Sequence, residues 1–396
     1  MLAPTLPAPI AAPTSQQRAP LAVIRKLFDR LHGAGIRYCQ WKSNQHLDAS
    51  MVGATDFDLL VDRRDASRFA EILAQEGVKP FRKIAGDEYP GVEDYLAFDT
   101  ERGALSHVHV HYQLTLGEKF LKGYRLPWER EALAARRFDT EHGLWVMDPR
   151  LELLLLVTRA AIKLRARDWV LAAAGRPYMS GGWLLEFRWL VERISIADLC
   201  TITRALVGEV ASRHLAELVQ TAVPSTGQLR RYRRAVEPRL ASYRMYGAVD
   251  GLRRRFMGEA GWVIVAAVNH RRGLEYRSTR VSPRGGLSVC VIGTQRDATN
   301  LARQLSHWLS TDMAVIPDLG ETTTTAARQG RDRGKIVIAD RFRPHAAVPP
   351  DLALALGDAM VAPNHPRTPA RVVRLDGTDS PARLLLQAKC ALWHSI

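Results

Sequence analysis

The sequence predicts a multidomain α/β protein, and two observations support this fold class. The chain has 396 residues, whereas one hydrophobic core rarely serves more than about 250 to 300. Helical and strand-like periodicities alternate at first, helical periodicity then dominates, and buried strand-like runs return near the end. We therefore expect a mixed-sheet domain at 20–149, a central helical domain at 150–275 and a second α/β domain at 286–396.

Two segments lie outside these domains. Residues 1–19 are rich in proline and alanine and lack a basic n-region, which indicates a disordered tail and not a signal peptide. Residues 276–285 (YRSTRVSPRG) are basic and contain proline and glycine, which predicts a linker. The four cysteines lie far apart without a Cys-x-x-Cys pair, which argues against a zinc ribbon or a disulfide framework and favours the cytoplasm.

The basic charge is concentrated in one part of the chain. The formal net charge is +15, and residues 230–284 contain fourteen arginines, no lysine and four acidic residues, a net +10. Guanidinium groups bind phosphate or carboxylate through two parallel hydrogen bonds. Two interpretations stay open: a solvated helical surface, or a face that binds an anionic polymer or membrane. The scattered tryptophans form no aromatic-interleaved basic stripe, which argues against nucleic acid read by sequence.

One apolar run bears on location. Residues 261–269 (GWVIVAAVN) are too few to cross a bilayer, and His270, Arg271 and Arg272 follow them. A buried core segment is the favoured interpretation. Peripheral attachment at the inner face of a membrane is the alternative.

The mixed-sheet domain is read from alternating patterns. Residues 20–33 and 66–76 carry apolar side chains at helical spacing. Residues 56–62 (DFDLLVD) predict a buried strand, and 94–98 and 107–112 predict two more.

Two carboxylates stand where the first of these strands begins. Asp56 and Asp58 are two residues apart, so on a strand they project from one face. Such a pair can hold one or two Mg²⁺ (or Mn²⁺) ions for an in-line displacement at phosphorus. We expect the upstream polar loop to hold the phosphates. Asp-x-Asp pairs are also common at strand starts without any catalytic role. The expected phosphate-side residues are Lys42, Ser43, Asn44 and Thr55.

Histidines alternate along the last of these strands. His107, His109 and His111 share one face, and neutral imidazole suits Zn, Ni or Fe better than Mg. His109 or His111 could assist catalysis, His109 as a general base. The alternative is that all three occupy a solvent-facing side of the strand.

These motifs resemble a known family. WKSN (41–44) and GATDFDLLV (53–61), followed by HVHYQLTLGEKF (109–120), look like bacterial nucleotidyltransferase-like proteins of the polymerase β type. Such proteins are often joined to a thymidylate-kinase-like domain and occur with extracellular-polysaccharide genes. The resemblance implies transfer of a nucleotidyl or related phosphoryl-containing group from an NTP to a small-molecule or saccharide acceptor. Asp56 and Asp58 match the metal carboxylates. Lys42 stands where the family has glycine, and His109 where it has a third carboxylate.

The third domain carries a degenerate phosphate loop. The Walker A pattern needs Gly-x-x-x-x-Gly-Lys-Ser/Thr after a strand. Here Gly293 is present, but Thr299 and Asn300 replace the lysine and the hydroxyl residue, and Arg296 only partly substitutes. Asp340-Arg341 resembles the Asp-Arg motif of thymidylate kinases. We expect a domain retained for structure or binding, with an altered nucleotide kinase as an alternative.

The helical domain offers further candidates. Lys163 lies on a helix expected near the sheet, as a triphosphate contact or a snorkelling lysine. Glu186 and Arg188 could line the cleft between the domains or form a surface ion pair. If both nucleotide sites are eroded, the protein is instead a non-catalytic accessory or regulatory factor that uses its arginine-rich face.

Overall fold

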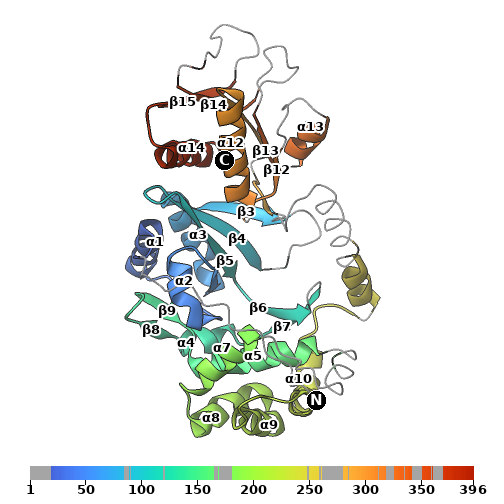
Figure 1. Cartoon of the computed structure of the whole chain (residues 1–396). Coiled ribbons are helices and arrows are strands. Elements are labelled where there is room, and N and C mark those ends of the chain that lie inside the picture. Colours follow the sequence, from blue (N-terminus) through green and yellow to red (C-terminus); the bar gives the residue numbers. More distant parts are fainter. Residues whose placement is uncertain are drawn as a thin grey trace, which may run out of the picture.

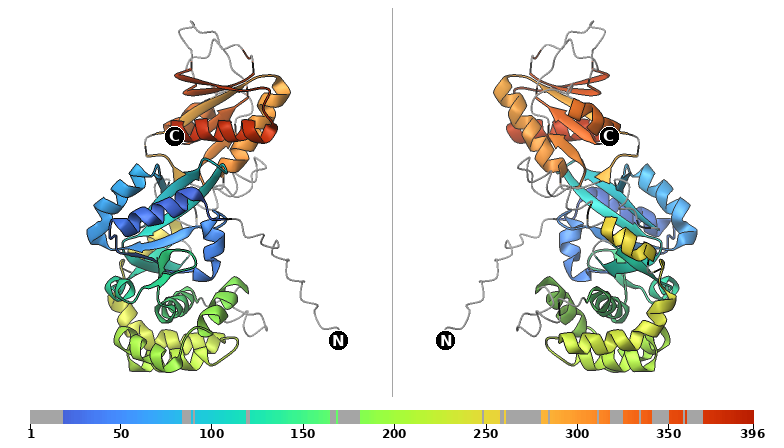
Figure 2. Two further views of the ribbon diagram at one scale, coloured as in Figure 1. Left: turned by 90° about the vertical axis from the view of Figure 1, so that its left-hand side faces the viewer. Right: turned by 90° about the vertical axis from the view of Figure 1, so that its right-hand side faces the viewer.

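The structure, a computed structural model, shows an α/β protein in which a parallel sheet, a mixed sheet and a helical layer follow one another along the long axis (Figure 1). The two side views keep the same order, with the mixed sheet in the middle (Figure 2). The described residues are 19–83, 89, 91–118, 121–164, 168, 181–247, 249–257, 260, 280–283, 285–310, 312–317, 325–333, 335–340, 350–357, 359 and 369–396.

The central sheet has eight strands in the order β10-β3-β4-β5-β2-β1-β9-β8. Its directions are mixed, because β2 runs parallel to β5 while β1 and β4 run antiparallel to their neighbours β2 and β5. The strands are β1 (Tyr38–Gln40), β2 (Phe57–Val61), β3 (Lys79–Lys83), β4 (Val92–Asp99), β5 (Ala104–His111), β8 (Arg137–Asp139), β9 (Leu144–Val146) and β10 (Arg280–Val281).

Strand β2 is buried on both faces, which explains its unbroken apolar run. Phe57 and Leu59 pack against helices α1 (Ala22–Gly33) and α3 (Ala66–Gln75), which present Phe28 and Phe69 at helical spacing. Leu60, on the opposite face, joins the core of the helical layer. The short helix α2 (Leu47–Met51) precedes β2.

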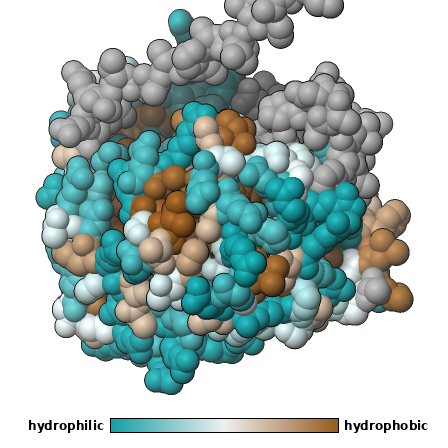
Figure 3. Space-filling model, turned by 90° about the horizontal axis from the view of Figure 1, so that it is seen from below, coloured by the Kyte–Doolittle hydropathy of each residue, from teal (hydrophilic) through white to brown (hydrophobic). Residues whose placement is uncertain are grey.

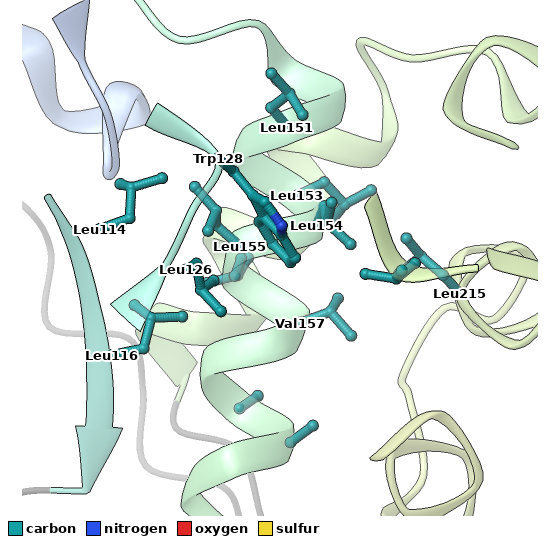
Figure 4. Packing of buried hydrophobic residues seen from close by; sticks show 14 of the residues in the cluster. Leu114, Leu116, Leu126, Trp128, Leu151, Leu153, Leu154, Leu155, Val157 and Leu215 are labelled. Carbon is teal, nitrogen blue, oxygen red and sulfur yellow. The ribbon is translucent and has the colours of Figure 1, made fainter. Parts of the chain in front are cut away.

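Helix α5 (Pro149–Lys163) is the centre of the helical layer. Asp148 caps its start by accepting a hydrogen bond from the Arg150 N–H, and proline occupies its first turn. In Figure 4, leucines of α5 pack against Trp128 and against Leu116 and Leu126 of the hairpin formed by β6 (Leu114–Glu118) and β7 (Leu121–Leu126). The other helices of this layer that the structure describes are α4 (Glu129–Ala134), α7 (Gly181–Val191), α8 (Ile196–Val207), α9 (Glu209–Val219) and α10 (Thr226–Ser242).

The surface of this helical layer, seen from below, is mostly hydrophilic, with hydrophobic side chains in small separate patches (Figure 3). None of the helices among the described residues has both the length and the apolar character that a membrane span requires.

The C-terminal sheet is wholly parallel, in the order β12-β13-β11-β14-β15. It shares a hydrophobic core with the central sheet, since Phe81, Leu96 and Phe98 pack in one cluster with Leu305 and Trp393. Its elements are β11 (Leu287–Ile292), α12 (Gln295–Ser310), β12 (Val315–Pro317), α13 (Thr325–Asp332), β13 (Ile336–Ala339), β14 (Leu352–Leu356), β15 (Arg371–Leu375) and α14 (Pro381–Ser395).

The segment expected to be a plain linker carries strand β10. Arg280 and Val281 pair antiparallel with Lys83 and Arg82 of β3, at the edge of the central sheet. The backbone N–H of Ala314, next to β12, donates to the Arg280 carbonyl over 2.7 Å. Residues 280–281 therefore tie the two sheets together.

The turn before β2 generates a stability prediction. Gly53 has φ +75°, and a Cβ there would lie 2.5 Å from the Leu105 carbonyl oxygen. Gly143 has φ +68° and nothing within 4 Å. We expect Gly143→Ala to cost about 1 kcal/mol of unfolding free energy, from the left-handed backbone alone. Gly53→Ala should cost roughly 3 kcal/mol, because a backbone atom must also move. Urea unfolding followed by circular dichroism measures both, and equal losses would contradict the close approach.

Candidate functional site

Asp58 is a buried carboxylate to which several polar groups converge. The parallel pairing of β2 and β5 sets Asp58 directly beside His109. Its Oδ1 lies 2.8 Å from Lys42 Nζ, 3.2 Å from His109 Nδ1 and 3.6 Å from His111 Nε2, and the residue is 7% exposed. The histidine face of β5 is therefore turned to the aspartates, and the interpretation of it as a solvent-facing side is wrong.

The protonation states follow from these contacts. Burial alone would raise the pKa of Asp58, but the Lys42 ammonium and the hydrogen bonds to His109 and His111 hold it well below its ordinary value. Burial lowers the pKa of His111 to about 3 and also lowers that of His109, although Asp58 opposes both shifts. At neutral pH the site thus contains an ionised carboxylate and two neutral imidazoles.

This donor set fits a divalent metal ion. Asp58, His109 and His111 each offer a ligand atom, and these atoms all lie within 4.8 Å of one another. The outer nitrogens His109 Nε2 and His111 Nδ1 are buried without a hydrogen-bond partner. One carboxylate with two imidazoles suits Mn²⁺, Fe²⁺ or Zn²⁺ better than Mg²⁺, which prefers oxygen ligands. The Lys42 ammonium lies 2.8 Å from Asp58 Oδ1, so it would compete with an ion bound to that oxygen.

Among the described residues, Asp56 is not part of the possible metal-binding group that Asp58 forms with His109 and His111. Its Oδ2 lies 2.9 Å from His107 Nδ1, and His107 Nε2 lies 2.7 Å from Oδ1 of Asp94 on β4. Burial would lower the pKa of His107, but the hydrogen bonds to the two aspartates raise it. Burial would raise the pKa of Asp56, but His107 lowers it. The Asp56 side chain remains 52% exposed, so solvent or a ligand can reach its carboxylate.

Residues far along the chain complete this second group. Arg280 of β10 places Nε 3.1 Å from Asp94 Oδ1 and Nη2 3.2 Å from His107 Nδ1. Asp312, before β12, lies close enough for its pKa to respond to His107, Arg280 and Asp56, although burial raises it most. Sequence reasoning missed Asp94, Arg280 and Asp312, because only the sheet brings them together.

The polar loop after β1 is held by carboxylates of the helical layer. The Ser43 N–H donates to Glu186 Oε1 over 3.3 Å, and the Asn44 N–H donates to Glu152 Oε1 over 3.0 Å. The Asn44 amide donates to Glu152 Oε2 over 2.6 Å. Ser43 adopts φ +59° within this contact. Two backbone donors expected to face phosphates therefore already have anionic partners.

Of the two carboxylates that hold this loop, only that of Glu186 was a candidate from the sequence. Glu186 is 8% exposed and accepts a hydrogen bond from the Ser43 N–H, so the interpretation as a surface ion pair is wrong. Arg188 instead donates to the carbonyl of Ala222. Glu152 was missed, because its position in a leucine-rich helix gives no local signal of a polar role. Burial raises the pKa of Glu152 to about 7 in spite of the hydrogen bonds from Asn44.

Basic side chains lie around the same loop. Partial burial, followed by the charges of Arg159 and Lys42, lowers the pKa of Lys163, and Glu186 opposes the shift. Arg159 lies over the Trp41 ring, 5.9 Å from its centre. Thr55, expected at the phosphates, is exposed and instead contacts the Ser50 hydroxyl at 2.8 Å.

A small pocket adjoins the Asp94 side of the site. Its volume is about 340 Å³, at the lower end of ligand pockets, which range from roughly 300 to 1,000 Å³. It is open and partly polar. The lining residues are Pro80, Phe81, Arg82, Tyr89, Val92, Glu93, Asp94 and Tyr95.

The degenerate phosphate loop is replaced by helix. Strand β11 ends at Ile292 and α12 begins at Gln295, so Thr299 and Asn300 lie inside the helix. The Thr299 hydroxyl and the Gln295 amide both donate to Asp340 Oδ2. A Cβ on Gly293 would stand 3.0 Å from Leu356, so this glycine serves packing against β14.

Two residues between strand and helix are too few to wrap a phosphate with backbone N–H groups. Arg296 is exposed, and Arg341 lies outside the described residues. The structure thus separates the C-terminal positions from the Asp58 site.

No protein-family model matches the chain, and no curated protein matches it.

The raised pKa of Glu152 predicts a pH-dependent stability. Its pKa of about 7 lies above the ordinary 4.5, so burial favours the protonated form. The stabilisation is complete below pH 4.5 and is lost as the pH rises through 7, at up to about 1.4 kcal/mol per pH unit. Glu152→Gln should therefore show a shallower fall of melting temperature than the wild type between pH 5 and about 8. The exposed Glu192→Gln is the control. Parallel profiles for all three proteins would contradict this origin.

The position of Lys42 predicts competition with metal. Its ammonium lies 2.8 Å from Asp58 Oδ1, and a charge-assisted contact of this kind contributes roughly 1.5 to 3 kcal/mol. Lys42→Met should therefore tighten Mn²⁺ binding about tenfold or more in titration calorimetry. Lys26→Met removes an exposed lysine that pairs with Glu76 and should change nothing. Weaker binding in the Lys42 variant would show that this lysine supports the metal-bound state.

Proposed function

We propose that the chain transfers a nucleotidyl or related phosphoryl-containing group from an NTP to a small-molecule or saccharide acceptor, with a divalent metal at Asp58. The observation that carries this proposal is that Asp58, His109 and His111 lie close together near the start of β2, beside the half-exposed Asp56. We assign the mixed-sheet part to a nucleotidyltransferase-like domain. The C-terminal parallel sheet is then a degenerate P-loop domain without kinase activity, which the two-residue β11–α12 connection supports.

Asp58, His109 and His111 would hold the metal ion. A divalent ion at such a site supplies charge neutralisation for the oxygens of the transferred group. The neutral state of the two imidazoles supports this role, because only an unprotonated ring nitrogen can be a ligand. Of the two ions expected from the sequence, Mg²⁺ and Mn²⁺, a donor set with two imidazoles fits Mn²⁺ better.

We assign Asp56 the role of general base. In the proposed step the acceptor hydroxyl oxygen bonds to the α-phosphorus, and the bond from phosphorus to pyrophosphate breaks. The hydroxyl proton passes to the Asp56 carboxylate, which His107 keeps ionised through a 2.9 Å contact. His107 is in turn oriented by Asp94. Asp56 is more accessible than His109, whose ring contacts Asp58, and is the better candidate for contact with an acceptor.

The basic side chains Lys42, Arg159 and Lys163 would attract the triphosphate. For phosphates to reach the backbone N–H groups of Ser43 and Asn44, Glu186 and Glu152 must first withdraw. The pocket lined by Glu93 and Tyr95 adjoins Asp94, and it is our candidate for the acceptor.

The occupied loop also favours a second candidate function. If Glu152 and Glu186 stay bound to the loop, no triphosphate can use it, and the protein is a non-catalytic accessory factor. The two functions differ in one measurable property, namely NTP binding that depends on Asp58.

Titration calorimetry and a transfer assay test the proposal. The protein is titrated with Mn²⁺ and each NTP, then incubated with saccharide acceptors and NTP labelled at the α- or the γ-phosphate. Transfer of the α-label is expected, and Asp58→Asn should reduce it at least about a hundredfold, since loss of a ligand exceeds the effect of losing an outer-shell partner. Asp48→Asn is the matched control, because it belongs to the exposed Asp48, Glu141 and His142 group. Absence of NTP binding, or binding unchanged by Asp58→Asn, would favour the accessory function.

A further inference from the structure

A helix at 249–257 lies at the outer side of the molecule, where Figure 1 shows it in yellow at the right-hand edge. Figure 2 shows it on the surface in the view from that side. Gly251 is buried, and a Cβ on it would stand 3.6 Å from Cδ2 of Leu121 at the start of β7. The helix therefore rests on the rest of the protein through its Gly251 side.

The opposite side of this helix is apolar and exposed. Val249, Leu252 and Phe256 are spaced by three and four residues, which places them on one helical face, turned away from Gly251. Their exposed fractions are 84%, 69% and 68%, the highest of any large hydrophobic side chains in the described part of the chain. Met257 adds 63% at the edge of this face. Such an exposed apolar face is a marker of an interaction surface.

Arginines flank the apolar face on the same helix. Arg253 is exposed and falls on the apolar side, Arg255 falls at one border, and Arg254 falls on the opposite side, near Gly251. Arg254 is positioned by Asp250, 3.0 Å away, and by the Tyr246 ring, 4.3 Å away. In the sequence, the stretch 230–284 that contains the helix has a net charge of +10. Apolar and basic side chains on one short helix are typical of helices that lie in a membrane interface.

We propose that the helix at 249–257 docks on an anionic membrane surface. Val249, Leu252 and Phe256 enter the boundary between headgroups and acyl chains, and Arg253, on the same side of the helix, meets lipid phosphates. A water-soluble polyanion would satisfy the arginines but leave the apolar side chains in water. A second copy of this chain would bring the same arginines against one another, which opposes pairing through this face.

This inference is independent of the proposed activity, and it selects the membrane from the anionic partners that the sequence left open.

Vesicle flotation of the full chain tests the proposal. Phosphatidylcholine vesicles with and without about one third phosphatidylglycerol are the probes, at moderate ionic strength. We expect binding to the anionic vesicles only. Leu252→Ser with Phe256→Ser keeps the charge and should weaken the partition coefficient about tenfold or more, and Arg253→Gln should weaken it about fivefold. Circular dichroism melting confirms that both variants are folded.

The matched control is Val210→Ser with Arg213→Gln on α9, which removes an exposed valine and an exposed arginine elsewhere. It should bind as the wild type does. If the control variant loses as much vesicle binding, the binding comes from the overall positive charge of the protein, and the proposal is overturned. So would unchanged binding of the Leu252/Phe256 variant, or no binding of the wild type. If sedimentation velocity shows that the wild type is a dimer and that the Leu252/Phe256 variant is a monomer, the face binds a second copy of the chain instead.

Discussion

The ionised state of the buried Asp58 is the constraint on which the site depends. An isolated carboxylate at 7% exposure would cost several kcal/mol or take up a proton. It remains charged because Lys42 and the imidazoles of β5 reach it from two directions. Those contacts require β2 to lie between β1 and β5, with β5 parallel and in this register. The negative charge of Asp58 therefore depends on the order of the central strands.

Hydrogen bonds to buried carboxylates also join the helical layer to the sheet. Glu152 and Glu186 face backbone donors of the loop after β1, and these contacts accompany the left-handed conformation of Ser43. A non-glycine residue in that conformation costs of order 1 to 3 kcal/mol and persists only where its surroundings hold it. The loop is thus shaped by residues more than 100 positions away, since Asn44 and Glu152 are 108 residues apart.

The sequence predicted the parts of this arrangement that have local patterns. The buried run of β2, the alternation along β5 and the helical periods of α1 and α3 each follow from the spacing of apolar residues. The proximity of Asp58 and His109 was anticipated from the resemblance to nucleotidyltransferase-like proteins. Strands β8 and β9 have three residues each and β10 has two, too few to show a period. The contact of Arg280 with Asp94 spans 186 residues, and no local preference encodes it.

Strand β10 has a consequence for the order of synthesis. The ribosome makes β3, β4 and β5 long before it reaches residue 280, because the whole helical layer comes first. During that interval the carboxylate of Asp94 and the ring of His107 lack the guanidinium that later covers them. The edge of β3 also stays unpaired, and open edges are sites of wrong association. The nascent chain therefore completes the group of Asp94, His107 and Arg280 only after the helical layer has been made, so early-terminated chains lack this group.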